Sequence, residues 1–205
     1  MATPEPRYPP QWRAGTTLFL KRWLRRPLSV GALVPSSRSL AEAIAAVTRA
    51  AIAGRNGCVV ELGAGTGEVT RALLEAGIRP HRLALIERDP ELAAFLRRRF
   101  PSLQVIEGDA KNLPALLAQA GRTEVAAVVS GLPLLSMPAD IVSAIVRGAF
   151  KALPEGAALV QFTYGPKPPV PRALREALHL AASHGPRIWR NVPPAVVWTF
   201  RRGAK

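Results

Sequence analysis

Residues 58–67 read Cys-Val-Val-Glu-Leu-Gly-Ala-Gly-Thr-Gly. A short β-branched run here enters a turn with glycine at every second position, and residues 68–74 then have the pattern of a helix. Strand, glycine turn and helix form the first unit of a nucleotide-binding α/β sheet, in which glycines let the backbone approach a ligand and the helix N-terminus faces it. The stretch therefore predicts a ligand site in an α/β domain.

The spacing of the glycines argues against a dinucleotide site. A dinucleotide fingerprint has the pattern G-x-G-x-x-G, and the place of its third glycine is taken here by Glu68. The pattern is G-x-G-x-G, with an acid, Glu61, near the end of the strand. Because a carboxylate beside the turn would repel a pyrophosphate, it suits a ligand that carries an ammonium group.

This stretch resembles the first motif of the class I methyltransferases, which bind S-adenosylmethionine. The resemblance implies a Rossmann-like α/β fold, with a seven-stranded, mostly parallel sheet and helices on both faces. It also implies that the strand end and the turn hold the cofactor. The residues concerned are Glu61, Gly63, Ala64, Gly65, Thr66 and Gly67.

A second acid follows at the end of the next expected strand, residues 83–87. Glu87 lies 20 residues beyond Gly67, the offset at which such folds place a carboxylate on the ribose hydroxyls. We assign Glu87 and its neighbour Arg88 to the cofactor site. A ribose contact fits the adenosyl group that the family binds.

A third candidate segment, Gly108-Asp109-Ala110, comes shortly after the expected strand at 104–106. In the family, an Asp at the position of Asp109 accepts a hydrogen bond from the adenine amino group. Asp109 would also cap the helix expected at 112–120, and the two roles are compatible.

Composition limits the class of protein. With 205 residues, the chain fits one ordinary domain. The longest uncharged apolar run, residues 125–139, is 15 residues long and is broken by glycine and prolines, so no membrane span is expected. A single cysteine, Cys58, excludes an internal disulfide and fits a reducing cytosol. The three histidines lack metal-ligand spacing, and no metal is expected.

The net charge of +14 is concentrated at the two ends of the chain. Residues 1–41 have a balance of +6 and residues 165–205 of +7, whereas residues 42–164 carry only +1. Such asymmetry implies an anionic partner, which is either nucleic acid or an acidic membrane surface. Solvated charge that serves solubility alone is the alternative.

Residues 16–26 predict an amphipathic helix, ended by Pro27. One arc is apolar and the other is basic, which is typical of a helix in an anionic membrane interface. The apolar arc holds Thr16, Phe19, Leu20, Trp23 and Leu24, and the basic arc Lys21, Arg22, Arg25 and Arg26. Docking of the helix on its own domain and contact with RNA are the alternatives. We expect a membrane-binding segment at 1–36 and the methyltransferase domain at 37–205.

The amphipathic segment, the run Val-Gly-Ala-Leu-Val-Pro-Ser-Ser at 30–37 and the glycine motif together resemble the bacterial phospholipid N-methyltransferases. These enzymes convert phosphatidylethanolamine stepwise to phosphatidylcholine. The resemblance extends from about residue 16 to the end of the chain. It implies a monomer that is peripheral on the inner face of the cytoplasmic membrane, with anionic phospholipids rather than nucleic acid as its partners.

The loop after the expected strand at 125–129 reads Ser130-Gly-Leu-Pro-Leu134. Methyltransferases that act on adenine or glutamine amides have Asn or Asp at the position of Ser130 and an aromatic residue at that of Leu134. This loop resembles that of the ribosomal adenine dimethylases in its Leu-Pro pair, yet it lacks both recognition side chains, and its leucines suit a lipid. An RNA adenine methyltransferase remains the alternative function.

Three residues are candidates for the acceptor side, although no catalytic base can be named. Ser130 takes the place of the recognition side chain, and we assign it to the cofactor site as well. Tyr8 and Tyr164 are candidates for contact with the amine or its methylated cation, which an aromatic face attracts. For the rest of the chain we expect helices at 139–152 and 170–183, and strands at 157–164, 187–191 and 196–202, the last one antiparallel.

Overall fold

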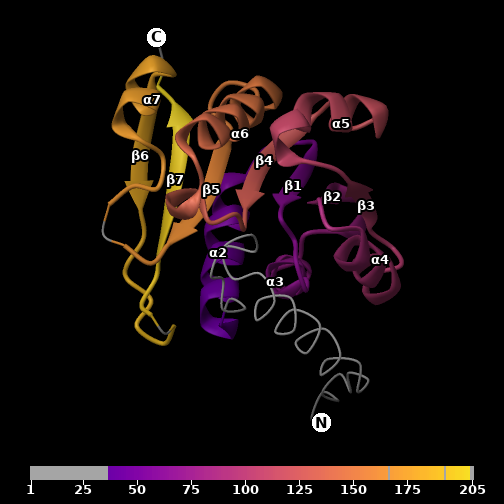
Figure 1. Ribbon diagram of the computed structural model, residues 1–205. Helices are drawn as coiled ribbons and strands as arrows, with labels where there is room; N and C mark the ends of the chain where they lie inside the picture. Colours follow the sequence, from indigo (N-terminus) through magenta and orange to yellow (C-terminus); the bar gives the residue numbers. More distant parts are fainter. Residues whose placement is uncertain (1–36, 166, 192, 204–205) are drawn as a thin grey trace.

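A computed structural model of the chain describes residues 37–165, 167–191 and 193–203 (Figure 1). The expected membrane-binding segment, 1–36, with its helix at 16–26 and with Tyr8, lies outside the described residues. Within them the chain forms a seven-stranded sheet with the order β3-β2-β1-β4-β5-β7-β6. The strands are β1 (Cys58–Leu62), β2 (Leu83–Glu87), β3 (Gln104–Glu107), β4 (Val125–Ser130), β5 (Ala158–Thr163), β6 (Leu180–His184) and β7 (Val196–Arg202).

Strands β1 to β5 run parallel, and β7 is antiparallel to both of its neighbours. Every residue of β1, β2, β4 and β5 is buried, as expected for parallel strands covered on both faces. The mostly parallel seven-stranded sheet and the antiparallel last strand that the sequence predicted are confirmed.

Helices cover both faces of the sheet (Figure 1). One face carries α2 (Arg38–Ala51), α3 (Glu68–Glu75) and α4 (Pro90–Arg99), and the other α5 (Leu113–Gln119), α6 (Ala139–Ala152) and α7 (Arg172–Ala177). Three short 3-10 turns lie between strands and helices: η1 (Pro80–Arg82) before β2, η2 (Ala110–Asn112) before α5 and η3 (Leu134–Ser136) before α6. None of the described helices is both long enough and apolar enough to cross a bilayer.

The order of the strands fixes where a ligand can bind. The chain builds outward from β1 to β3 on one side and from β4 to β5 on the other, so the direction of winding reverses between β1 and β4. In open α/β sheets, ligands bind at such a reversal, beyond the carboxyl ends of the strands. The loops after β1, β2, β3 and β4 meet at this edge, which we call the carboxyl edge.

The C-terminal part differs from the prediction. The helix expected at 170–183 ends at Ala177, and His179 adopts a left-handed φ of +53°. Residues 180–184 then form β6, and the stretch 187–191 contributes only an isolated bridge between Ile188 and Ala195. Residues 180–184 have no strong strand preference of their own. They form the edge strand β6 because β7 offers them backbone hydrogen-bond partners.

Candidate functional site

Side chains from other elements pack closely against the glycine turn after β1. Gly63 has a φ of +68°, and a Cβ there would lie 2.6 Å from Leu132 Cδ2 in the loop after β4. Gly67 has a φ of +81°, and a Cβ there would lie 2.5 Å from Phe100 Cε2. Any side chain at these two positions would therefore strain the backbone and displace a packed neighbour. Together with Gly65, these two glycines leave the backbone of the turn uncovered by side chains at the N-terminus of α3.

Glu87, at the end of β2, holds the turn in place. The backbone N–H of Gly65 donates to Glu87 Oε2 at 2.9 Å, and that of Asp89 donates to Oε1 at the same distance. Burial raises the pKa of the Glu87 carboxyl, and the two backbone donors lower it in part. The acid predicted to bind ribose thus lies directly against the glycine turn.

Glu61 is 2% exposed and lies on the strand side of the turn. The hydroxyl of Thr70, on α3, donates to Glu61 Oε2 at 2.7 Å. Burial raises the pKa of the carboxyl to about 8, against the opposing effect of the Thr70 hydrogen bond. A cation that came close to Glu61 would favour the ionised carboxylate, since opposite charges stabilise one another strongly in a buried place.

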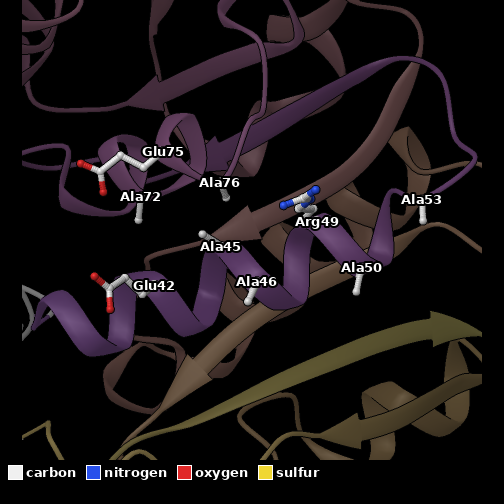
Figure 2. A pocket seen from close by; sticks show the side chains of 9 residues that line it. All are labelled: Glu42, Ala45, Ala46, Arg49, Ala50, Ala53, Ala72, Glu75 and Ala76. Atoms are coloured by element: carbon white, nitrogen blue, oxygen red, sulfur yellow. The ribbon is translucent and has the colours of Figure 1, made fainter. Parts of the chain in front are cut away.

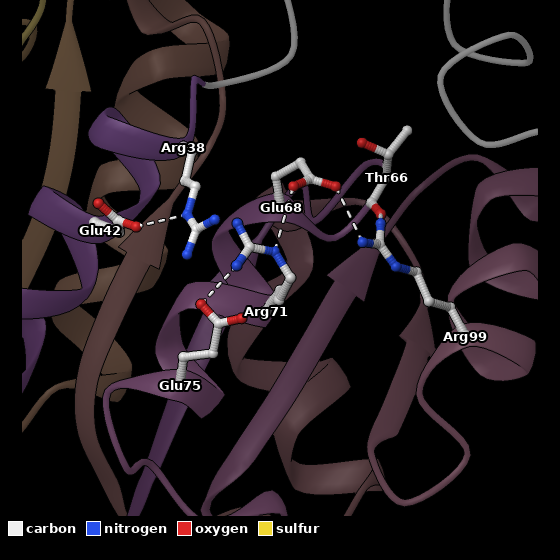
Figure 3. Close-up of polar contacts among 7 residues, drawn as sticks. All are labelled: Arg38, Glu42, Thr66, Glu68, Arg71, Glu75 and Arg99. Atoms are coloured by element: carbon white, nitrogen blue, oxygen red, sulfur yellow. Dashed lines mark hydrogen bonds and ion pairs between the residues drawn. The ribbon is translucent and has the colours of Figure 1, made fainter. Parts of the chain in front are cut away.

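An arginine from α4 clamps the turn from outside (Figure 3). Arg99 donates to the carbonyl oxygen of Thr66, and it pairs with Glu68 at 3.0 Å. In the sequence alone, the run of three arginines at 97–99 predicts a solvated or membrane-facing surface. Arg97 and Arg98 are exposed, but Arg99 is largely buried against the turn, so for Arg99 that prediction is wrong. The last turn of α4 packs beside the first turn of α3, which a reading of α4 alone does not reveal.

The segment after β3 reaches the same edge. The N–H of Gly108 donates to the Glu87 carbonyl oxygen at 3.0 Å, which ties this loop to the end of β2. Asp109 Oδ1 accepts from the N–H of Lys111 at 3.0 Å and so caps η2, which begins at the buried Ala110. The other oxygen of Asp109 lies 4.0 Å from the exposed guanidinium of Arg88. The cap predicted for a helix at 112–120 is made instead to the 3-10 turn before it.

The loop after β4 contacts the glycine turn directly. The N–H of Gly131 donates to the Leu62 carbonyl oxygen at 2.8 Å, and a Cβ at Gly131 would lie 2.9 Å from the Gly63 carbonyl oxygen. Ser130 is buried at the end of β4, and its Oγ accepts from the N–H of Leu132 at 3.3 Å. The structure thus brings the predicted acceptor loop and the predicted cofactor turn into contact.

Two buried polar side chains beside this loop were not singled out in the sequence. Gln161, on β5, is the register partner of Ser130, and its Nε2 donates to the Leu132 carbonyl oxygen at 2.9 Å. Trp198, on β7, is the register partner of Gln161 on its other side. Gln161 Oε1 and Trp198 Nε1 are buried and have no hydrogen-bond partner among the described residues. An unpaired buried oxygen and N–H are costly, so they mark a place for a polar ligand atom or water.

Tyr164 follows β5 at the same edge but packs into the core. Its ring meets that of Phe162 edge to face, with centroids 5.6 Å apart, and burial raises the pKa of its phenol. The structure therefore favours packing over contact with a substrate for Tyr164. Tyr8 lies outside the described residues, so its role stays a prediction.

A groove with a volume of about 630 Å³ lies elsewhere, between α2 and α3 (Figure 2). Alanines form most of its wall, and Glu42, Arg49 and Glu75 lie at its rim. It includes none of the predicted cofactor residues. Among the described residues there is also no cluster of three His, Cys, Asp or Glu side chains that could hold a metal ion. The site is therefore the carboxyl edge, where strand-end acids surround a bare turn.

Comparison with known proteins identifies this arrangement. Residues 59–156 match the family model described as "Methyltransferase domain". The chain is 34% identical over 153 residues to the ornithine lipid N-methyltransferase of Singulisphaera acidiphila, an alignment that covers 73% of this chain and 78% of that protein. The chain belongs to the class I S-adenosylmethionine-dependent methyltransferases. Its cofactor is S-adenosylmethionine, as the glycine motif predicted.

Other similarities are partial or concern the fold alone. The chain is 46% identical over 65 residues to ribosomal RNA small subunit methyltransferase A of Chlorobium chlorochromatii, which is 31% of this chain and 24% of that protein. Among solved structures, it resembles the 1,6-didemethyltoxoflavin-N1-methyltransferase of Burkholderia thailandensis, with a TM-score of 0.65 and 16% identity over 98% of this chain and 94% of that one. At 16% identity the likeness concerns the fold alone. It confirms the Rossmann-like class I methyltransferase fold that the sequence predicted for this chain.

The residues present fit the cofactor of this family. Bare backbone at the turn lets an elongated molecule approach closely. The buried Glu61 carboxyl has no cation among the described residues within hydrogen-bond distance, so a cationic ligand that bound beside it would favour its ionised form. Glu87 and Asp109 stand at the ends of neighbouring strands, β2 and β3, where hydroxyl and amino donors of an adenosyl group would find acceptors.

Proposed function

We propose that this methyltransferase N-methylates a membrane lipid, and that its substrate is phosphatidylethanolamine, which it converts with its mono- and dimethyl forms toward phosphatidylcholine. The composition of the acceptor loop carries the proposal. Ser130 and Leu134 stand where enzymes that act on planar amides or bases carry an amide and an aromatic ring, and Leu132 packs against the glycine turn. The named activity of the Singulisphaera relative supports a lipid amine as the class of acceptor.

The chain's own groups at this place accept hydrogen bonds. S-adenosylmethionine, when bound, supplies a methyl group activated by a sulfonium sulfur. An amine attacks only as the neutral base, because an ammonium group has no lone pair. Ser130 Oγ and Gln161 Oε1 lie on adjacent strands and face the same side of the sheet, so they can accept hydrogen bonds from the N–H groups of the primary and the monomethyl amine and orient the lone pair in the first two transfers.

An RNA adenine methyltransferase is the second candidate. It rests on the ribosomal RNA methyltransferases, such as the protein from Natronomonas pharaonis, which is 40% identical over 50% of this chain and 33% of its own length. These matches cover half of this chain or less and about a third of each relative or less. Because the acceptor loop lacks a stacking ring, we favour the lipid.

A methyl-transfer assay with labelled cofactor separates these candidates. Vesicles of phosphatidylethanolamine with anionic lipid, vesicles of ornithine lipid, and ribosomal RNA are offered separately, with Glu61→Ala as the inactive control. Label in phosphatidylethanolamine that moves to phosphatidylcholine with time is the expected result. Label in ornithine lipid alone would overturn the headgroup but keep the lipid class, and label in RNA alone would overturn both.

We further propose that the enzyme works as a monomer on the inner face of the cytoplasmic membrane, and that residues 16–26 hold it on anionic phospholipids. The separation of apolar and basic residues onto opposite arcs of the helix predicted there supports this role. Replacement of Phe19, Leu20, Trp23 and Leu24 by Ser is expected to release the protein from anionic vesicles in a sedimentation assay. Undiminished sedimentation would contradict the role of this segment.

A further inference from the structure

The loop between β6 and β7 (residues 185–195, of which 192 lies outside the described residues) leaves the sheet at the carboxyl edge. β7 begins at Val196, which pairs with Thr163, the last residue of β5, and β6 ends at His184, which pairs with Trp198. The two strands therefore turn on the side where the parallel strands end (Figure 1). The loop lies on the same edge of the molecule as the cofactor turn and the acceptor loop.

This edge carries the large hydrophobic side chains that the described part of the chain leaves exposed. Trp189, in the β6–β7 loop, is 70% exposed, and Leu135, in η3 directly after the acceptor loop, is 60% exposed. A Cβ at Gly165 would lie 3.9 Å from Leu135 Cδ1, so Leu135 lies beside the segment that leaves β5. Exposed tryptophan and leucine on one edge, among so many buried ones, point to a surface that something apolar covers.

The β6–β7 loop is anchored on both sides of its exposed tip. Ile188 and Ala195 exchange backbone hydrogen bonds of 2.7 and 3.3 Å. Asn191 is buried, and its Nδ2 donates to the Pro193 carbonyl oxygen at 2.6 Å. Its Oδ1 accepts from the N–H of Ser37, the residue that joins the segment 1–36 to α2. Trp189 thus lies in a loop that is anchored beside Ser37, the residue that follows the segment 1–36.

The charged residues of the β6–β7 loop on either side of Trp189 are both positive. The guanidinium of Arg187 lies 5.2 Å from the centre of the Trp189 ring, and Arg190 is exposed beside it. The sequence from residue 177 to 203 contains no Asp or Glu. An indole flanked by cations is typical of a membrane–water interface, where the ring lies at the headgroup level and the cations meet anionic lipids.

We infer that Trp189, Arg187 and Arg190 of the β6–β7 loop, together with Leu135, form a second membrane contact, which docks the carboxyl edge on an anionic phospholipid bilayer. This rests on the proposed lipid substrate, and it gives the site its orientation: the acceptor loop faces the lipid surface from which a headgroup must enter. A stacked nucleic acid fits less well, because Leu135 has no ring for a base to stack on.

Vesicle binding without turnover tests the inference. The full chain with Arg187→Ala, Trp189→Ala and Arg190→Ala is compared with the wild type on phosphatidylcholine vesicles with and without phosphatidylglycerol. The matched control, Arg79→Ala with Arg172→Ala, removes two exposed cations from the opposite edge. We expect the triple variant to bind anionic vesicles about tenfold more weakly or worse, and the control to bind as the wild type does. Affinity for S-adenosylmethionine, measured by calorimetry, shows that each variant is folded.

Quenching by brominated lipid gives an independent readout. The wild type and Trp189→Phe are compared, so that their difference reports Trp189 alone, and quenching of Trp189 supports its entry into the bilayer. Unchanged vesicle affinity of the triple variant, or an equal loss in the control, would overturn the inference. The inference would also be overturned if light scattering showed a wild-type dimer that the triple variant no longer forms, while both proteins still bound vesicles. The loop would then be a contact between two copies of the chain. Because no methyl transfer is needed, each of these results is separate from the assay of the proposed substrate.

Discussion

The hydroxyl of Thr70 donates a 2.7 Å hydrogen bond to the buried carboxyl of Glu61, one turn of α3 away from the glycine turn. This contact and the burial of Glu61 together set the pKa of its carboxyl at about 8, because burial disfavours the charged form more than the hydroxyl favours it. The folded protein therefore keeps a proton that the unfolded chain releases near pH 4.5.

A pH dependence of stability follows for the protein without cofactor. The folded pKa is raised, so between pH 4.5 and 8 the folded state binds one proton more than the unfolded state, and the free energy of unfolding falls as pH rises. The contribution of one such group is about 1.4 kcal/mol per pH unit and levels off above the folded pKa. Glu61→Gln is expected to remove this slope and to be more stable than the wild type at pH 8.

Urea unfolding at several pH values checks this prediction. Glu155→Gln, which changes an exposed side chain, is the control and should retain the wild-type slope. A wild type and a Glu61→Gln variant with parallel pH profiles would show that Glu61 is ionised in the folded protein at neutral pH.

Gly67→Ala is expected to damage both folding and cofactor binding. The left-handed φ costs a side chain about 1–2 kcal/mol, and the new Cβ would in addition meet Phe100 at 2.5 Å. Gly77→Ala is the matched control, because Gly77 has a φ of +90° but nothing within 4 Å of the new Cβ. We expect the free energy of unfolding to fall further for Gly67→Ala than for Gly77→Ala, and only Gly67→Ala to weaken cofactor affinity. Equal losses in the two variants would mean that the contact with Phe100 relaxes at no cost.

Arg99→Ala is expected to loosen the glycine turn. The guanidinium bridges the Thr66 carbonyl oxygen and the Glu68 carboxylate, and hydrogen bonds that involve a charged group contribute about 1.5–3 kcal/mol when they are shielded from water. Calorimetry should show cofactor binding weakened by about tenfold or more, whereas Arg98→Ala, which alters an exposed neighbour, should leave it unchanged. If the two variants bound alike, the clamp would have no part in shaping the turn.

The cofactor half of the site could be predicted because its signals are local. A strand, a glycine turn and a helix follow one another within residues 58–75, and Glu87 and Asp109 each come directly at or after a strand end. Since the carboxyl ends of parallel strands share one edge, prediction of the strands was enough to predict that these residues meet. The strands β1 to β5 were accordingly placed to within about one residue.

What escaped prediction depends on contacts between distant segments. Arg99 reads as one of three similar arginines, and only the packing of α4 beside α3 sets it apart. The strand β6 exists because β7 offers it a partner, although the residues 180–184 continue a helical pattern. Gln161 stands out as a polar residue in an apolar strand, yet its meaning depends on its registers with Ser130 on β4 and with Trp198 on β7.

Gln161→Leu is expected to impair methyl transfer more than cofactor binding. The substitution removes the donor to the Leu132 carbonyl oxygen, which fixes the acceptor loop, and the unpaired Oε1 that faces the same side as Ser130. A loop displaced by even a fraction of an ångström misaligns the acceptor amine, so kcat should fall by about 10- to 100-fold while cofactor affinity stays within about twofold. Gln104→Leu is the control, because Gln104 makes its contacts to Ala120 and Arg122 at the start of β3, away from the acceptor loop. A folded Gln161→Leu variant with wild-type kcat would remove Gln161 from the acceptor site and leave its contact with Leu132 a matter of stability alone.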